Sequence, residues 1–200
     1  MTREHHLIEA QLSDTDVLSQ VIALSFHALA PSEWLIADPA ERTRIFPGYF
    51  RLYVTDAMTR GRVYTTEDRT AAALWLPGGP TADPEPADYD ERLSAETGPH
   101  IERFRLFDAI LAKHHPAAFS HDHLAILAVH PQHQNQGIGS ALLQTHHERL
   151  DSRDPAGVAY LEASDAGTRE LYLKHGYRDH GTPIELPEGP SMYPMVRAAP

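Results

Sequence analysis

Apolar residues are arranged along this chain in two different ways. Val17, Leu18, Val21 and Ile22 have the three-to-four spacing of a helix face, whereas residues 123–129 form a short apolar run of strand length. Extended over the chain, these patterns predict strands at 7–10, 62–66, 70–76, 123–129, 158–162, 177–184 and 191–197, and helices at 17–30, 47–60, 89–96, 101–114, 138–150 and 166–175. A fold of mixed helices and strands is therefore expected.

Polar and breaker residues mark the boundaries of these elements. The four residues from Ser13 have the Ser-x-x-acid form of a helix capping box, and Pro47 suits the first turn of the helix that follows. Residues 31–39 are rich in breakers and are expected to form a loop that holds Trp34. Residues 81–86 are rich in proline and acidic side chains, which predicts an exposed loop.

The strand predicted at 123–129 is followed by a turn and by a helix whose first turn is nearly free of side chains. Gly137 and Gly139 leave the unpaired N–H groups of this helix start accessible, and such groups carry partial positive charge. We therefore expect a phosphorylated cofactor here. No lysine stands beside either glycine, so the P-loop pattern of ATP and GTP sites is absent. The last position of the dinucleotide-binding pattern holds the bulky Leu142, which disfavours a nicotinamide cofactor.

Two motifs in this half of the chain resemble those of a known family. Gln134, Gly137 and Gly139, in this order after an apolar strand, look like the Gln-x-x-Gly-x-Gly pyrophosphate-binding signature of the GNAT superfamily of acyl-CoA N-acyltransferases. Residues 171–177 resemble the Leu-Tyr-x-x-x-Gly-Phe/Tyr element of that superfamily. In that element the first tyrosine, here Tyr172, lies beside the cofactor sulfur.

The resemblance narrows to one branch of the superfamily. Four further segments look like puromycin N-acetyltransferase and its relatives: residues 73–77, 128–131, 161–164 and 186–195. Two positions depart from that branch, which usually has Asn where Thr168 stands and often Gly where Asn135 stands. These departures bear on cofactor affinity and substrate more than on the class of reaction.

The resemblance implies an α/β (α+β) fold of the GNAT type, with helices flanking a central mixed, mostly antiparallel sheet of about seven strands that is splayed at strands 4 and 5. It implies a single domain over residues 1–200 and acetyl-CoA as cosubstrate. Backbone amides of residues 136–140 are expected to hold the diphosphate, and the edge of the strand at 123–129 to pair with the pantetheine amides. The implied cofactor-binding residues are Leu127, Val129, Gln134, Asn135, Gln136, Gly137, Ile138, Gly139, Ser140 and Thr168.

Direct transfer from a thioester to an amine needs a proton donor for the thiolate and a nitrogen that has lost its extra proton. Tyr172 fits the donor because a tyrosine with a pKa of ~10 keeps its proton at neutral pH, and the alternative is a plain core tyrosine. Glu162 and His123 are the candidate bases. The alternative for Glu162 is an ion pair or a clamp for the substrate ammonium, and for His123 an ordinary surface histidine. For an acceptor α-amino group with a pKa of ~7.7, a chain of water molecules is a sufficient base, whereas a lysine-like amine with a pKa of ~10.4 needs a dedicated one.

Composition and charge exclude several classes of binding partner and cofactor. The formal net charge of −11 and the lack of a long Lys/Arg run argue against nucleic acid, and no run of about eighteen apolar residues predicts a membrane span. The chain has no cysteine, which excludes disulfides, an acyl-cysteine intermediate and Cys-ligated zinc. Its 14 histidines show no spacing typical of a closed metal site, so no metal is expected. We expect a cytoplasmic monomer or homodimer.

Together these observations predict an acetyl-CoA-dependent N-acetyltransferase that acts on a primary amine of a small molecule. The resemblance adds a puromycin-like aminoacyl antibiotic as the substrate, and hence antibiotic resistance as the role. Four aromatic residues are candidates for the lining of an acceptor pocket: Phe26, Trp34, Tyr53 and Trp75. Two alternatives stay open, a non-catalytic acyl-CoA-binding or sensory domain and a nicotinamide-dependent oxidoreductase.

Overall fold

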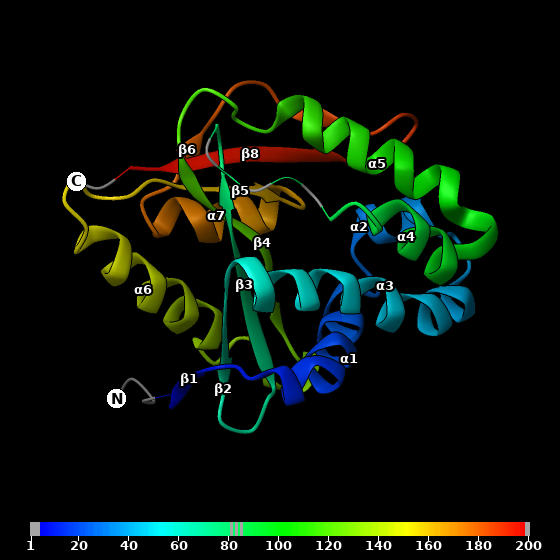
Figure 1. Cartoon of the computed structure of the whole chain (residues 1–200), viewed down its shortest axis with the longest axis horizontal. Helices are drawn as coiled ribbons and strands as arrows, with labels where there is room; N and C mark the ends of the chain where they lie inside the picture. The colour runs from blue at the N-terminus through cyan, green and yellow to red at the C-terminus, as the bar shows by residue number, and fades with distance from the viewer. Residues whose placement is uncertain (1–4, 81, 83, 85, 199–200) are drawn as a thin grey trace.

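The computed structural model describes residues 5–80, 82, 84 and 86–198 (Figure 1). The strands are β1 (Leu7–Glu9), β2 (Arg62–Thr66), β3 (Ala71–Gly78), β4 (His121–Val129), β5 (Ala159–Ala163), β6 (Arg178–Asp179), β7 (Ile184–Glu185) and β8 (Ser191–Arg197). The α-helices are α1 (Thr15–Phe26), α2 (Ala30–Leu35), α3 (Pro39–Arg60), α4 (Tyr89–Thr97), α5 (Ile101–His114), α6 (Ile138–Asp151) and α7 (Ala166–Lys174). Short 3₁₀ turns lie at Leu12–Asp14, Gly98–His100 and Pro131–His133.

Within the described residues the strands form one eight-stranded sheet in the order β1-β2-β3-β4-β5-β8-β6, with β7 paired to β8. The pairs are antiparallel except for β4 and β5, which run parallel. This confirms the mixed, mostly antiparallel sheet flanked by helices. The strand count differs from the expected one because the segment predicted as one strand at 177–184 gives two short strands, β6 and β7.

The parallel strands β4 and β5 pair over a short distance and then separate. The paired residues are Asp122 with Ala159 and His123 with Tyr160. Beyond His123, β4 continues to Val129 with its other edge still paired to β3. The predicted splay between strands 4 and 5 is therefore confirmed, and it leaves one edge of β4 open to a ligand.

A bulge lies in the same part of β4. Leu74 of β3 pairs with Ile126, and the next residue, Trp75, pairs with Leu124, so Ala125 is an extra residue on β4. A bulge bends its strand and takes one residue out of the hydrogen-bond ladder. The bend lies at the point where β4 leaves β5.

The sheet separates two apolar cores, because neighbouring residues of a strand point to opposite faces. On one face Ala72 and Leu74 pack with residues of α1, α3 and α5. On the other face Ala73 and Trp75 pack with residues of α6 and α7. Figure 1 shows the same division, with α6 and α7 on the left and α1 to α5 on the right.

The first two helices differ from the prediction. α1 ends at Phe26 rather than near residue 30, and α2 forms inside the predicted breaker loop. Pro31 is tolerated because it lies in the first turn of α2, where a missing N–H costs no hydrogen bond. The predicted Ser13 cap is also wrong: Asp14 is the N-cap residue of α1 and makes no side-chain capping bond to it. Its carboxylate instead accepts from the Gln11 N–H at 2.9 Å, in a capping box of the 3₁₀ turn Leu12–Asp14.

The third helix begins earlier than predicted. Pro39 occupies the first turn of α3, and the Asp38 carboxylate caps it by accepting from the Ala40 N–H at 2.8 Å. Pro47 therefore lies inside the helix rather than at its start. An Asp-Pro pair supplies both a capping side chain and a residue preset for the first turn, which makes it a stronger start signal than Pro47 alone.

The remaining predicted strands and helices are confirmed, with small shifts at their ends. The loop predicted at 81–86 falls partly outside the described residues, which omit 81, 83 and 85. None of the helices in the described part of the chain combines the length and the hydropathy that a bilayer-crossing segment needs.

Candidate active site

A cavity of about 530 Å³ lies where β4 and β5 separate. Residues of α1, α2, α3 and α5 line one side of it, and residues of α6 and α7 line the other. Twelve of the site residues predicted from the sequence face it: His123, Leu127, Val129, Gln134, Asn135, Gly137, Ile138, Gly139, Ser140, Glu162, Thr168 and Tyr172. Gln136 is not among the lining residues. The fold thus brings segments far apart in sequence to one cavity.

The loop before α6 presents the start of that helix to the cavity. Gly137 caps α6 with a left-handed backbone, φ 85°, which residues with a Cβ adopt at a cost. Gly139 is different, because a Cβ built there would lie 3.7 Å from Leu127 Cδ2, an ordinary contact. The packing of the chain therefore does not require glycine at 139. Its missing side chain leaves room for a ligand in front of the helix N–H groups.

Side chains around this loop hold its backbone in place. The Gln134 side-chain amide donates to the Val129 carbonyl at 3.1 Å and so fastens the loop to the end of β4. The Gln136 carbonyl accepts from the His5 ring at 2.8 Å. Both glutamines therefore fix the position of the loop. No sequence pattern pointed to His5, because only the fold brings the segment before β1 next to this loop.

Tyr172 lies on α7 with 9% of the residue exposed. Asp165 caps this helix: its Oδ1 accepts from the Thr168 N–H at 2.8 Å, and Thr168 Oγ1 accepts from the Asp165 N–H at 3.2 Å. The Thr168 hydroxyl is thus engaged in the cap. Burial raises the pKa of Tyr172 above its ordinary value, so the phenol keeps its proton.

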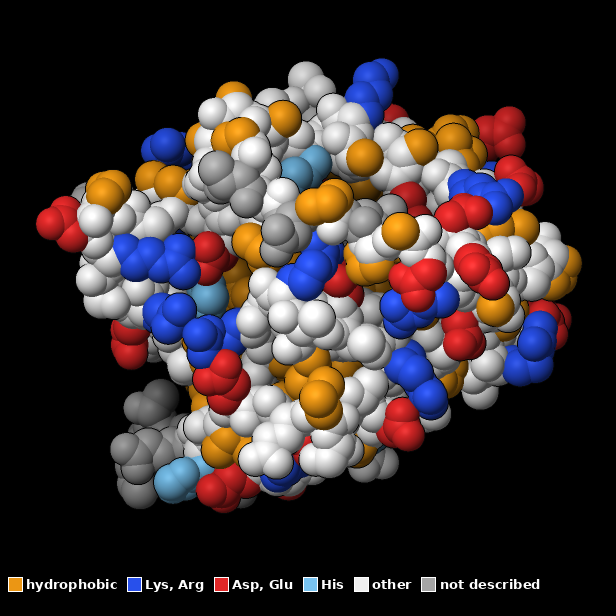
Figure 2. Space-filling model, in the orientation of Figure 1, with side chains coloured by type: hydrophobic (Ala, Val, Ile, Leu, Met, Phe, Trp, Pro, Cys, Tyr) orange, Lys and Arg blue, Asp and Glu red, His pale blue; other side chains and the backbone are white. Residues whose placement is uncertain are grey.

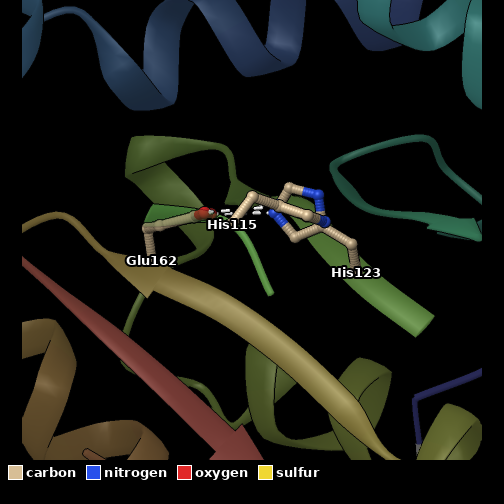
Figure 3. A group of neighbouring side chains, drawn as sticks. All are labelled: His115, His123 and Glu162. Atoms are coloured by element: carbon tan, nitrogen blue, oxygen red, sulfur yellow. Dashed lines mark hydrogen bonds and ion pairs between the residues drawn. The ribbon is translucent and has the colours of Figure 1, made fainter. Parts of the chain in front are cut away.

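Glu162 meets two histidines beside the cavity (Figure 3). His123 Nε2 lies 2.8 Å from Glu162 Oε2, and His115 Nδ1 lies 3.8 Å from Glu162 Oε1. The three side chains come from β4, β5 and the residue that follows α5. Only 7% of the Glu162 side chain is exposed, and its Oε1 has no hydrogen-bond partner within the described part of the chain. No sequence motif pointed to His115, which lies eight residues before His123 but far from Glu162 along the chain.

The charge state of Glu162 follows from its neighbours. Burial would raise its pKa, but the His123 and His115 side chains outweigh burial and hold the pKa of Glu162 below its usual range. Nearby, burial lowers the pKa of His121 to about 4 and raises the pKa of the Tyr160 phenol. The ionised Glu162 carboxylate therefore lies near a neutral His121 ring and a neutral Tyr160 phenol.

The other lobe of the cavity is apolar and aromatic. Its lining includes Phe26, Tyr49, Phe50, Tyr53 and Phe107. The hydroxyls of Tyr49 and Tyr53 lie 3.0 Å apart and form a hydrogen bond. Burial raises the pKa of both phenols, so they are uncharged. This lobe suits an apolar or aromatic molecule.

Two of the four aromatic residues suggested for this lobe, Phe26 and Tyr53, line the cavity. The other two do not. The Trp34 indole donates to the Pro187 carbonyl at 2.8 Å. Trp75 stacks on His146, with ring centroids 3.8 Å apart, in the core on the opposite face of the sheet.

Acidic and basic side chains are interspersed on the face shown in Figure 2. Ion pairs among the described residues include Arg169 with Asp179 at 2.5 Å and Arg105 with Asp90 at 2.7 Å. This face therefore offers no broad basic area of the kind that binds a phosphate backbone.

Comparison with known proteins places this geometry in context. Residues 107–179 match the family model described as the acetyltransferase (GNAT) domain. This stretch contains β4, the glycine loop, α6, β5 and α7, all of which contribute residues to the lining of the cavity.

Solved structures resemble the whole chain. One, titled histone acetyltransferase HPA2 and related acetyltransferase, from Corynebacterium glutamicum, has a TM-score of 0.71 at 20% identity, over 98% of this chain and 97% of that chain. Arylalkylamine N-acetyltransferase 2 from Aedes aegypti has a TM-score of 0.63 at 13% identity, over 98% and 99%. The polyamine N-acetyltransferase of Drosophila melanogaster has a TM-score of 0.53 at 15% identity, over 96% and 99%.

At these identities the likeness concerns the fold. The chain therefore has the GNAT fold, and the segment that matches the acetyltransferase domain carries the glycine loop, Glu162 and Tyr172.

Proposed function

We propose that this chain is an acetyl-CoA-dependent N-acetyltransferase that transfers the acetyl group directly to a primary amine of a small molecule. One observation carries the proposal. A single cavity joins the open helix start at Gly137 and Gly139, the free edge of β4, the Tyr172 phenol and the Glu162 carboxylate, and it continues into an aromatic lobe. Cofactor and acceptor would therefore meet where β4 leaves β5.

Free backbone hydrogen-bonding groups identify the part of the cavity that would bind acetyl-CoA. The N–H groups at the start of α6 bind the diphosphate, and the free edge of β4 around Leu127 and Val129 pairs with the pantetheine amides. The bulge at Ala125 takes one residue of β4 out of the hydrogen-bond ladder, and a main-chain N–H released there would stabilise the negative charge that develops on the thioester oxygen during transfer.

The chemistry then needs two proton transfers. The neutral amine nitrogen attacks the thioester carbon, a C–N bond forms, and the C–S bond breaks. Tyr172 gives its proton to the leaving thiolate. The ammonium proton leaves toward the His123–Glu162 pair, directly or through water, and Glu162 also attracts the ammonium form of the substrate into the cavity.

The lining favours one class of acceptor. Among the described residues that line the cavity, Glu162 is the one carboxylate, and the acceptor lobe is otherwise mainly aromatic and aliphatic, with the uncharged Ser25 and Ser32. A monoamine with an aromatic body matches this lining better than a polyamine, which carries a second cation. A puromycin-like aminoacyl compound belongs to the matching class, and acetylating it would give the protein a role in antibiotic resistance.

An amine panel tests the proposal. The purified protein is mixed with acetyl-CoA and with puromycin, phenethylamine, agmatine or spermidine, and the released coenzyme A thiol is followed. We expect the aromatic monoamines to give the higher kcat/KM values. The proposal fails if no amine in the panel releases thiol above the rate with water alone, and the aromatic assignment fails if spermidine or agmatine is preferred.

A further inference from the structure

The cluster of His115, His123 and Glu162 has a use that acetyl transfer does not require. The potential ligand atoms of these three residues, one from each side chain, lie within 4.8 Å of one another (Figure 3). Two independent observations indicate that the cluster receives a cation: the proton positions along a histidine chain, and an unpaired buried oxygen.

The Phe119 carbonyl determines which ring nitrogens of His121 and His115 carry a proton. His121 Nδ1 lies 3.0 Å from the Phe119 carbonyl, which accepts only, so His121 Nδ1 is the donor. The Nε2 atom of a neutral His121 is then an acceptor, and it lies 3.0 Å from His115 Nε2. His115 Nε2 must therefore donate. Unless a proton or another cation lies between the two groups, the Nδ1 lone pair of His115 then faces Glu162 Oε1 at 3.8 Å.

This arrangement is the one that metal-binding histidines show. Such a histidine donates its remote N–H to a neighbouring group, which fixes the ring and turns the other nitrogen to the ion. The ion would also resolve the second observation, because Glu162 Oε1 is buried and has no hydrogen-bond partner among the described residues. An unpaired buried carboxylate oxygen is costly, and a cation removes that cost.

We propose that His115, His123 and Glu162 bind a divalent transition-metal ion of the Zn²⁺ type. Two imidazole nitrogens and one carboxylate oxygen suit Zn²⁺ and Co²⁺, whereas Mg²⁺ and Ca²⁺ require oxygen ligands. Because His123 and Glu162 line the cavity, a fourth coordination position faces the space for the acceptor.

The side chains have room to adjust to the ion. Ligands about 2.1 Å from a tetrahedral zinc ion lie about 3.4 Å apart, so the His115 nitrogen must approach and the His123–Glu162 hydrogen bond must open slightly. His115 follows the end of α5 and 28% of its side chain is exposed, so its ring can shift toward the ion while Nε2 keeps its hydrogen bond to His121. The ion takes the lone pairs that would otherwise receive the acceptor ammonium, so metal and amine compete.

Direct metal binding tests the proposal without acetyl-CoA or amine, so its outcome is independent of the proposed acetyl transfer. Tag-free protein is stripped with EDTA, exchanged into chelator-free buffer and titrated with Co²⁺, while its visible absorption is followed, and Zn²⁺ is then added. We expect a single equivalent of Co²⁺ to give an intense tetrahedral-type spectrum that Zn²⁺ abolishes. Absence of that spectrum would overturn the proposal.

Two variants and a matched control locate the site. His115→Ala and Glu162→Gln should each weaken the stoichiometric binding by about 100-fold or more, because each removes a ligand. His114→Ala should bind Co²⁺ like the original chain, since His114 Nδ1 bonds the Ile110 carbonyl at 2.9 Å and lies outside the cluster. Thermal melting shows that each variant is folded. Unchanged binding by both ligand variants, or an equal loss in His114→Ala, would place the ion elsewhere.

Discussion

At the scale of single residues, a neutral phenol and an ionised carboxylate line the same cavity. Burial holds the proton on Tyr172, and the histidines beside Glu162 hold its carboxylate in the ionised form. Their environments push the two pKa values in opposite directions, which is the usual basis for assigning acid and base roles. Both positions could be predicted from the sequence, because each lies in a short motif of adjacent residues.

Tyr172→Phe should lower kcat by about 100-fold or more and leave the Kd for acetyl-CoA unchanged, because the phenol acts on the leaving thiolate rather than on the cofactor's binding groups. Tyr177→Phe is the matched control, since the Tyr177 hydroxyl bonds His147 at 3.0 Å and does not line the cavity. Steady-state kinetics and calorimetric titration measure the two constants. Equal kcat values for the two variants would remove Tyr172 from the acid role.

His115 shows where residue-level prediction ends. It follows α5, whereas its neighbours in space lie on β4 and β5, so no local pattern connects them. The same limit explains Trp34 and Trp75, because an aromatic residue in a sequence shows neither the face of the sheet that it joins nor the partner that its N–H finds.

At the scale of elements, the proposed cofactor site depends on the point where β4 leaves β5. Apolar runs and glycine signals predicted β4, α6, β5 and α7 in order. The bulge at Ala125 could not be predicted, because it follows from the register between β3 and β4, and the sequence shows only an unbroken apolar run there.

Gly139→Val should raise the Kd for coenzyme A by about tenfold or more and leave the fold intact. A Cβ at this position meets only ordinary contacts within the protein, but the side chain would stand in front of the N–H groups at the helix start. Gln144→Val, on the exposed face of the same helix, is the control. Calorimetric titration measures both affinities, and an unchanged Kd in Gly139→Val would show that the diphosphate binds elsewhere.

Asp165→Ala should destabilise the protein by about 1 kcal/mol, because it removes the carboxylate that caps α7. The same change should reduce kcat, since α7 positions Tyr172. Asp165→Asn should restore most of the stability, because asparagine also caps helices well. Urea unfolding provides the comparison. A variant without the cap that is as stable as the original chain would contradict this role.

At the scale of the whole molecule, buried histidines link stability to pH. His147 is 6% exposed, and burial, with help from Arg197, lowers its pKa to about 3 from the ordinary 6.5. Between these two values the unfolded chain binds a proton that the folded chain does not. The contribution of His147 is therefore complete above pH 6.5 and is lost as the pH falls toward 3.

The free energy of unfolding should thus fall on acidification by up to about 1.4 kcal/mol per pH unit from this residue. His147→Gln retains a partner for the Tyr177 hydroxyl but does not titrate, so its stability should depend less steeply on pH between 6.5 and 4. Urea unfolding at several pH values gives both slopes. Parallel slopes would show that His147 is not a source of the acid sensitivity.

The overall fold could be predicted because several independent sequence patterns, spread over the whole chain, agree with one another. Alternating apolar residues, glycine and proline boundaries and two linked motifs all indicated the same order of strands and helices. The errors lie where two start signals compete, as at Pro39 and Pro47, or where proline suits a helix start as well as a loop, as at Pro31.

A crystal structure of the complex with coenzyme A tests the central claim most directly. We predict the diphosphate within hydrogen-bond distance of main-chain N–H groups of residues 136–140, the pantetheine along the free edge of β4, and the sulfur beside the Tyr172 hydroxyl. A cofactor bound with its diphosphate away from the start of α6, or with its sulfur outside the cavity that holds Tyr172 and Glu162, would contradict the account.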